Sequence, residues 1–262
     1  MSAAVNRLKA TIVTRSPVQI FPLPGLPEIR RGDDLARLIL GAVRMQQFQA
    51  VAADVFVIAQ KIVSKAEDRI VSLDSIVPSD RSKKWAQEWG KDPRVIELVF
   101  RESKRIIRME RGVIVAETSH GFVCANAGID LSNADEGTAI LLPEDPDASA
   151  RALQIRLRES FGVDVGVIIS DTFGRPWREG LVNVALGVAG TAPLIDYRGE
   201  RDANGKLLQA TIIALADELA SAAELVMGKA DRVPVAIIRG VASGGGGSGR
   251  DLIRPEERDL FR

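Results

Sequence analysis

The chain has 262 residues, of which 46% are hydrophobic and 27% charged, with 35 basic and 35 acidic side chains. This balance is typical of a globular protein with a sizeable core, and the zero net charge offers no general attraction for nucleic acid or an anionic membrane. A single cysteine, Cys124, and a single histidine, His120, exclude an internal disulfide and a zinc site built from several such residues. No apolar run reaches the roughly 20 residues of a membrane span, and the first residues do not resemble a secretory signal, so we expect a cytoplasmic protein.

The first part of the chain predicts a strand, a stiff loop, a helix and a second strand. Residues 9–15 have the composition of a strand, and the proline-rich stretch 21–29 predicts an irregular loop. Asp33 or Asp34 can cap a helix, which would be followed by a strand over residues 54–63. Lys65 follows that strand and could hold a phosphate as a point charge, although a solvated surface lysine is the commoner outcome.

The middle of the chain predicts two helices and a pair of strands. Residues 79–90 predict a short helix whose two tryptophans, one turn apart, share a packing face. Asp92 and Pro93 open a second helix, with an apolar stripe that continues to Ile106. Residues 112–116 and 122–125 then predict paired strands.

Polar residues follow this strand pair. Asp130 and Asn133 lie three positions apart, so a short turn would direct both side chains at one point. His120 could act as a base or a ligand, but a lone histidine is more often a structural hydrogen-bonding group, which we favour. Cys124 lies in an apolar run and is expected to be an inert core thiol.

The most informative stretch is a buried strand over residues 163–169 that follows a helix capped at Asp145 and ending near Phe161. The strand is predicted to end at Ser170-Asp171-Thr172, where Gly174 and Pro176 force a turn. A carboxylate and a hydroxyl at a strand end suit a hard cation such as Mg²⁺, and the nearby Arg175 and Arg178 suit the phosphates that it carries. The alternative is that Asp171 and Thr172 only cap their own turn.

The remaining chain predicts a strand over 181–190, a turn-rich polar segment over 196–206, a helix over 210–227 and a last strand over 233–238. The glycine- and serine-rich residues 243–249 do not form a phosphate-binding loop, because Arg250 and Asp251 stand where that motif needs Lys and Ser/Thr. They predict a connector instead. Strands and helices mix without strict alternation, so we expect an α+β fold with mixed or antiparallel sheets and flanking helices.

Several stretches together resemble one family, the coenzyme F-420-0:L-glutamate ligases, also called gamma-glutamyl ligases. The resemblance runs in register from about residue 21 to the C-terminus and makes residues 1–262 a single ligase domain. It lies in GLPEIRRGDDLA (25–36), QKIVSKAEDR (60–69), GFVCANAGIDLSN (121–133), ISDTFGRPWREG (169–180), and IDYRGERDANG with ADELASAAELVMG within 195–228.

The resemblance implies a GTP-dependent amide ligase. Such an enzyme adds L-glutamate to a deazaflavin coenzyme precursor and extends a gamma-linked glutamate tail. It also implies a divalent cation, magnesium or manganese, stimulation by potassium, and a two-lobed monomer in an intertwined homodimer. Some relatives carry a nitroreductase-like domain after this one.

The resemblance also implies the site residues. The metal ligands would be Asp130, Asp171 and Thr172. The residues lining the nucleotide site would be Leu26, Pro27, Glu28, Ile29, Gln60, Lys65 and Asn133, with residues 205–212 approaching it. The family often has a small hydroxyl residue at the position of Gln60. Arg175 and Arg178 are assigned as phosphate clamps by their chemistry and not by motif.

The chemistry agrees with these residue types. A carboxylate can be activated by the gamma-phosphoryl group of GTP, and phosphoryl transfer needs charge neutralisation more than a covalent residue. A ligase with a different acceptor or amino acid would share every motif. A metal- and nucleotide-binding regulatory module would bind nucleotide without releasing phosphate, and a structural dimerisation protein would leave the polar loops unexplained.

Overall fold

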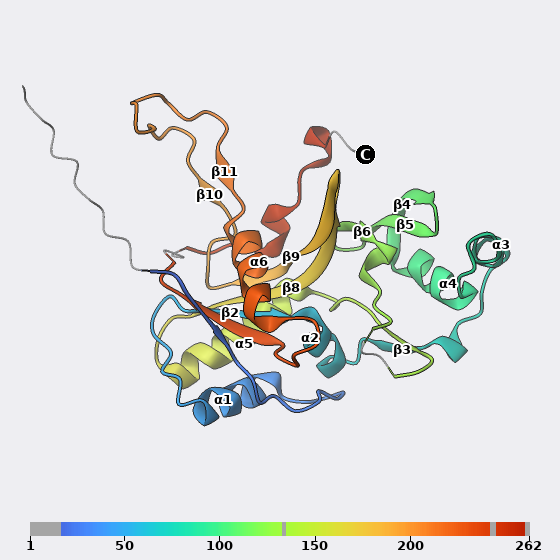
Figure 1. Ribbon diagram of the computed structural model, residues 1–262, viewed down its shortest axis with the longest axis horizontal. Helices are drawn as coiled ribbons and strands as arrows, with labels where there is room; N and C mark the ends of the chain where they lie inside the picture. The colour runs from blue at the N-terminus through green and yellow to red at the C-terminus, as the bar shows by residue number, and fades with distance from the viewer. Residues whose placement is uncertain (1–16, 133–134, 242–244, 260–262) are drawn as a thin grey trace, which may run out of the picture.

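The computed structural model describes residues 17–132, 135–241 and 245–259, and it has the expected α+β fold. A five-stranded sheet lies at its centre, in the order β1-β12-β2-β8-β9 (Figure 1). Only β2 and β8 are parallel, and every other pair in this sheet is antiparallel. The strands are β1 (Gln19–Pro22), β2 (Val55–Ala59), β8 (Gly166–Arg175), β9 (Arg178–Ala189) and β12 (Val235–Arg239). The predicted strand over 9–15 lies outside the described residues.

Helices cover both faces of this sheet because its central strands bury side chains on both sides. Phe56 and Ile58 of β2 face the cluster that contains α1 (Leu35–Met45) and α5 (Pro146–Phe161). Val55 and Val57 face α6 (Leu215–Met227) on the opposite side. Successive side chains of a strand point to opposite faces, so a run that is apolar throughout forms a strand buried between two helical layers.

The local signals for α1 and α5 are confirmed. The Asp34 side chain caps α1 by accepting from the Arg37 N–H, and the Asp145 side chain caps α5 by accepting from the Ala148 N–H. Helix α5 ends at Gly162, which has a φ of 69°, a left-handed conformation that glycine adopts without a Cβ penalty. These caps set the ends of the two helices that pack against one face of the central sheet.

A second group of elements forms the other lobe (Figure 1). Its sheet has the order β4-β5-β6, and the predicted pairing of residues 112–116 with 122–125 is confirmed. Two further apolar clusters lie within it. Its elements are β3 (Ile70–Ser72), η1 (Leu73–Ser75), α3 (Asp80–Trp89), α4 (Pro93–Glu102), β4 (Ser103–Glu110), β5 (Val113–Thr118), β6 (Val123–Ala125), η2 (Asn126–Gly128) and β7 (Thr138–Ile140).

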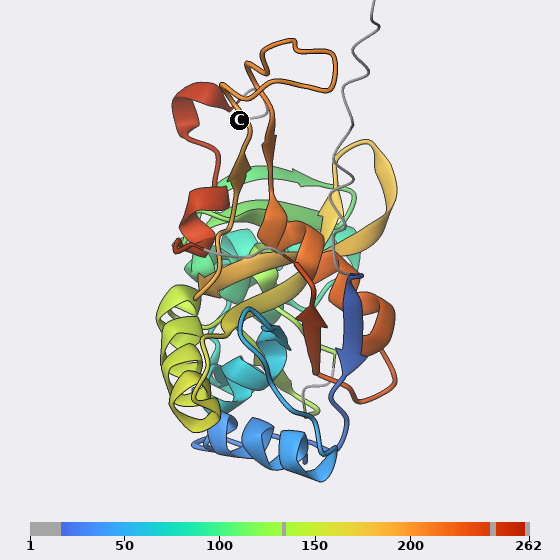
Figure 2. The same cartoon turned by 90° about the vertical axis from the view of Figure 1, so that its left-hand side faces the viewer.

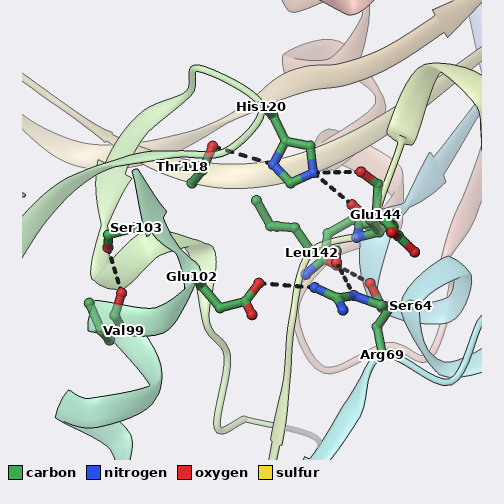
Figure 3. Close-up of polar contacts among 11 residues, drawn as sticks. Ser64, Arg69, Val99, Glu102, Ser103, Thr118, His120, Leu142 and Glu144 are labelled. Atoms are coloured by element: carbon green, nitrogen blue, oxygen red, sulfur yellow. Dashed lines mark hydrogen bonds and ion pairs between the residues drawn. The ribbon is translucent and has the colours of Figure 1, made fainter. Parts of the chain in front are cut away.

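Arg69 joins the two lobes, as Figure 3 shows. Its Nε donates to the carbonyl oxygen of Leu142 at 2.9 Å, and its Nη2 lies 2.9 Å from Oε2 of Glu102 on α4. The guanidinium group therefore ties the chain that leaves the central sheet to both a helix and a connection of the second lobe.

Two projections extend from the same side of the molecule (Figure 2). One is the outer part of the β8–β9 hairpin, and the other is the loop between β10 (Ile195–Asp196) and β11 (Ile212–Ile213). Beyond α6 and β12, the described chain ends in η3 (Gly249–Leu252) and η4 (Glu256–Arg258). Within the predicted connector, Gly249 donates its N–H to Oδ1 of Asp147 at 2.6 Å, so this part lies against α5. None of the described helices has the length and apolar character that crossing a bilayer requires.

Two predicted boundaries in the first half are wrong. The strand predicted over 54–63 stops at Ala59, and Gln60 begins α2 (Gln60–Ala66) because strand pairing with β8 ends at Ala59. The helix predicted to continue to Ile106 stops at Glu102, and Ile106 lies on β4. The Ser103 hydroxyl donates to the carbonyl oxygen of Val99 at 2.5 Å, which satisfies a terminal carbonyl of α4 (Figure 3).

Two boundaries in the second half also differ. Strand β8 does not open into a loop at Asp171, because β9 continues the ladder by pairing Asp171 with Val184 and Thr172 with Asn183. Helix α6 begins at Leu215 and not at residue 210, because β11 takes up Ile212–Ile213. Asp171 is therefore held by a strand and has less freedom than a loop residue would have.

Candidate functional site

A cavity of about 250 Å³ opens where the parallel strands β2 and β8 end. The carboxyl ends of parallel strands are a common place for ligands in sheets flanked by helices. Most of the residues proposed from the sequence for nucleotide and metal line this cavity: Leu26, Pro27, Glu28, Ile29, Gln60, Lys65, Asp171 and Thr172. Stretches that are far apart along the chain therefore meet at one place.

Two buried polar groups at the cavity have no hydrogen-bond partner among the described residues. They are Nε2 of Gln60 and Oγ of Ser170, from residues that are 1% and 2% exposed. Oε1 of Gln60 is occupied, since it accepts from the Ser64 hydroxyl at 2.8 Å. A buried polar group without a partner costs about 1–3 kcal/mol, so a ligand that supplied the missing partners would gain affinity here.

Lys65 and Glu28 form an ion pair at the cavity wall. Nζ of Lys65 lies 2.5 Å from Oε1 of Glu28. The lysine side chain is 14% exposed, whereas that of the glutamate is 75% exposed. Because the exposed carboxylate can turn into solvent at little cost, an incoming anion can replace it at the lysine.

Asp130 and Asp171 lie within electrostatic reach of each other and of Lys61. Oδ2 of Asp130 lies 2.6 Å from Nζ of Lys61, and its Oδ1 accepts from the Ser132 N–H at 2.7 Å. The pKa of Asp171 is raised to about 6, chiefly by burial and in part by the negative charge of Asp130, while the Thr172 N–H and nearby lysines oppose the shift. The carboxyl group is surrounded by protein yet still lines the cavity, so it is poised for a cation.

The oxygen donors here fit a magnesium or manganese ion. Asp130 and Asp171 supply carboxylates and Thr172 supplies a hydroxyl, and Mg²⁺ in proteins is often held by one or two carboxylates with water and substrate phosphate. Across the described ranges there is no cluster of three or more His, Cys, Asp or Glu side chains that could enclose an ion by itself. Nζ of Lys229 contacts Oγ1 of Thr172, so that hydroxyl would have to exchange this contact for the ion.

Asp130 pairs with the cavity-lining Lys61 but is not itself among the lining residues. The remaining proposed residues lie apart from the cavity or outside the description. Arg175 and Arg178 are at the outer end of the β8–β9 hairpin and are not among the lining residues. Nη2 of Arg175 donates to the carbonyl oxygen of Glu179 at 2.8 Å, and Arg178 is exposed. Asn133 lies outside the described residues. Within this monomer the arginines therefore face a different environment from Lys65 and Asp171.

His120 has the bonding expected of a structural group (Figure 3). Its Nδ1 lies 3.3 Å from Oγ1 of Thr118, and its Nε2 lies 3.0 Å from the carbonyl oxygens of both Pro143 and Glu144. The ring therefore links the β5–β6 turn to the segment before α5. Cys124 is buried, and burial raises the pKa of its thiol to about 12, so the thiol is unreactive at neutral pH.

We expect His120→Ala to lower stability and spare activity. Loss of these hydrogen bonds should cost about 1–2 kcal/mol, which corresponds to a fall of roughly 2–8 °C in the unfolding temperature of a chain of this size. Thermal unfolding and a ligation assay measure the two effects on the same preparation. A loss of activity without a loss of stability would contradict the structural role.

Sequence reasoning missed several residues that line the cavity: Lys61, Ser170, Asn183, Glu224, Lys229 and Arg232. Asn183 carried a signal, since it is a lone amide in an otherwise apolar run. It accepts from the Thr172 hydroxyl at 2.8 Å and donates to Oε2 of Glu224 at 2.9 Å. Glu224, Lys229 and Arg232 carried none, because each is one charged residue among many on α6 or in the connection that follows it.

Comparisons with known proteins identify the family of the chain. The family model described as F420-0:Gamma-glutamyl ligase matches residues 25–240. The coenzyme F420:L-glutamate ligase of Methanothermobacter thermautotrophicus is 49% identical over 249 residues, which cover 94% of this chain and 99% of that protein. The protein of the same name from Methanopyrus kandleri is 50% identical, with coverage of 94% and 98%, and that of Haloarcula marismortui is 40% identical, with coverage of 94% and 96%. With this match along most of its length, the chain belongs to the F420-0:gamma-glutamyl ligase family.

Proposed function

We propose that the protein is a GTP-dependent ligase that adds L-glutamate to the deazaflavin precursor of coenzyme F-420 and extends a gamma-linked tail. Relatives that match the chain almost end to end bear the name of a glutamate ligase for this coenzyme. The observation that carries the proposal is the cavity in which the 26–29 segment, Lys65 and the end of β8 meet. We also infer that the protein acts in the cytoplasm and is stimulated by potassium.

The reaction must activate a carboxylate, because hydroxide is a poor leaving group. A carboxylate oxygen of the acceptor attacks the gamma-phosphorus of GTP, the bond to the beta-phosphate oxygen breaks, and GDP leaves. The glutamate nitrogen then attacks the acyl carbon, phosphate departs with the electron pair of the C–O bond, and the nitrogen loses a proton. Both steps move negative charge between oxygen atoms, so they need positioned positive charge and no covalent residue.

The residues at the cavity have different roles in these two steps. Lys65 neutralises nucleotide phosphate once Glu28 has turned away, and Gln60 and Ser170 offer hydrogen bonds to a bound substrate. Asp130, Asp171 and Thr172 would hold a divalent cation. Such a cation supplies charge neutralisation for the transferring phosphoryl group.

We further propose that the protein works as a homodimer. Apolar side chains are exposed on both projections: Trp177 is 82% exposed and Leu181 is 67% exposed on the β8–β9 hairpin, and Leu207 is 46% exposed on the β10–β11 loop. A second copy could cover them and bring Arg175 and Arg178 to a neighbouring cavity, where they would clamp phosphate. Sedimentation equilibrium measures the molar mass that tests this association.

Product masses test the function directly. Purified protein is incubated with the deazaflavin precursor, L-glutamate, GTP and manganese, and products are resolved by mass spectrometry. We expect masses that increase by successive glutamyl units, with one phosphate released per unit. Parallel reactions replace GTP by ATP, or glutamate by another amino acid.

The same reactions separate the alternatives. Nucleotide binding without phosphate release would favour the regulatory module. Ligation of another amino acid, or of another acceptor, would favour a related ligase on this scaffold. Either result would overturn the proposed activity.

The manganese requirement should depend on pH. Burial raises the pKa of Asp171 to about 6, so below that pH its carboxyl group is mostly protonated. Because a proton and a cation compete for the same oxygen atoms, the manganese concentration for half-maximal rate should rise by about tenfold per pH unit below 6 and stay level above it. Rates measured against manganese between pH 5 and 8 test this. A requirement that does not change with pH would contradict it.

A further inference from the structure

The connection between α6 and β12, residues 228–234, forms one wall of the cavity. Lys229 and Arg232 both line it, beside the polar end of β8, where Nζ of Lys229 contacts the Thr172 hydroxyl. Neither cation has a role in the nucleotide or metal sites inferred from the family resemblance. The wall therefore carries two positive charges that the proposed nucleotide and metal sites do not use.

The partners of the cavity's cations differ. Lys61 and Lys65 of α2 each pair closely with a carboxylate, as described above. Nζ of Lys229 lies 3.4 Å from Oε1 of Glu224, a longer contact, and the lysine side chain is 61% exposed. Arg232 is exposed and has no hydrogen bond or ion pair to any described residue. One positive charge at the cavity thus stands without a carboxylate partner in the described part of the chain.

The backbone holds this wall in an unusual conformation. Gly228 has a φ of 59° and Arg232 a φ of 55°, so the residues at both ends of the turn have a positive φ. A Cβ at Gly228 would lie 2.2 Å from Oδ2 of Asp231, so the Asp231 side chain folds over the start of the turn. A left-handed arginine costs roughly 1 kcal/mol or more, and such costs persist where the surrounding structure fixes the position. The placement of Arg232 at the cavity is thus a built feature of the turn.

We propose that Arg232, assisted by Lys229, binds a carboxylate of the amino-acid substrate, an inference that rests on the proposed function. The amino group of that substrate must reach an acyl carbon close to Asp171, so its carboxylate must lie nearby. The wall that carries Arg232 also carries Lys229, which contacts Thr172 near the end of β8, and neither cation is among the residues that we assign to the nucleotide. A guanidinium group offers a planar pair of donors that matches a carboxylate, and its single unpaired charge matches a single carboxylate.

The test uses three variants of the full protein. Arg232→Asn removes the charge while keeping a residue that tolerates a positive φ, so folding is preserved. Arg232→Lys keeps the charge but loses the planar donors. Arg158→Ala removes an exposed arginine on α5 that does not line the cavity, and it is the matched control.

Steady-state kinetics with each substrate varied in turn give the first readout. For Arg232→Asn we expect the KM for L-glutamate to rise on the order of 10- to 100-fold, the range of a lost charge-assisted hydrogen bond, with the KM for GTP and for the deazaflavin acceptor little changed. Arg232→Lys should recover part of the loss, and Arg158→Ala should match the parent protein. An unchanged KM for glutamate, or a rise confined to GTP or the acceptor, would assign Arg232 elsewhere and overturn the proposal.

Thermal unfolding with L-glutamate alone gives a second readout that does not depend on turnover. Glutamate should raise the unfolding temperature of the parent protein and of Arg158→Ala, but not that of Arg232→Asn. Equal shifts in all three proteins, or no shift in any, would overturn the carboxylate site. If the parent makes no glutamylated product, the proposed function fails separately, and this titration still decides whether Arg232 binds the amino acid.

Discussion

Asp171→Asn should reduce ligation by about a thousandfold or more while leaving the fold intact. The amide keeps the shape of the carboxyl group but not the charge that would hold a divalent cation, and loss of one such electrostatic contact typically costs 10²- to 10³-fold, with more expected for a direct metal ligand. Turnover at saturating manganese measures the effect. A normal rate under those conditions would remove Asp171 from the metal site.

The same variant should be more stable than the parent protein above about pH 6. The pKa of Asp171 is raised by burial, so the folded state favours the protonated form and is destabilised when the carboxyl group ionises. The gain in unfolding temperature should therefore grow as pH rises from about 4 to 6 and then stay constant. Lost activity with unchanged or higher stability separates a functional role from a folding defect.

Asp217→Asn is the matched control. Burial also raises the pKa of this carboxyl group, which accepts from the Ala185 N–H at 2.9 Å, but it does not line the cavity. It should show a similar trend of stability with pH and retain ligation. A comparable loss of activity in both variants would point to a general effect of buried carboxyl groups.

Arg239→Met should lower the free energy of unfolding by about 3–5 kcal/mol. Asp54 is fully buried, and its two oxygens accept from Nε and Nη2 of Arg239 at 2.8 and 2.7 Å. The guanidinium group also lies over the ring of Phe48, 4.9 Å from its centroid. Removing the cation leaves a buried carboxylate uncompensated, the most costly way to break such a pair. The pair fastens β12 to the start of β2, which positions the sheet beneath the cavity.

Chemical denaturation of Arg239→Met measures this loss, and the double variant Asp54→Asn/Arg239→Met is its control. The neutral amide can still accept from the Val51 N–H, which donates to Asp54 at 2.9 Å, so the double variant should recover part of the stability. If the free energy of unfolding of the single variant fell by less than about 0.5 kcal/mol, water would already solvate the Asp54 carboxylate.

Short-range signals predicted the caps of α1 and α5 correctly. Asp34, Asp145 and Gly162 act on the residues next to them, so caps and turns can be identified without knowing what packs nearby. The boundaries at Ala59 and Asp171 could not be found this way. One depends on where the pairing of β2 with β8 stops, and the other on how far β9 accompanies β8, and both are contacts between distant parts of the chain.

The candidate site was predicted in outline through the family resemblance. Residues such as Lys65 and Asp171 lie in recognisable motifs, and the cavity brings them together. Arg232 and Glu224 could not be found, because a charged residue after or on an amphipathic helix looks like any solvated side chain. Only the packing of α6, which brings Glu224 to Asn183, and the path of residues 228–234, which brings Arg232 to the cavity wall, reveal these positions.

The ion pairs in the cavity have a consequence for the order in which ligands are accepted. Each lysine of α2 has an internal counterion, Glu28 for Lys65 and Asp130 for Lys61. A nucleotide without metal would replace Glu28 at Lys65 but leave Asp130 paired with Lys61. A metal ion without nucleotide would bind Asp130 but leave Lys65 paired with Glu28. On the proposed function, a preassembled metal–nucleotide complex would exchange both partners at once, so we expect it to bind more readily than either component alone.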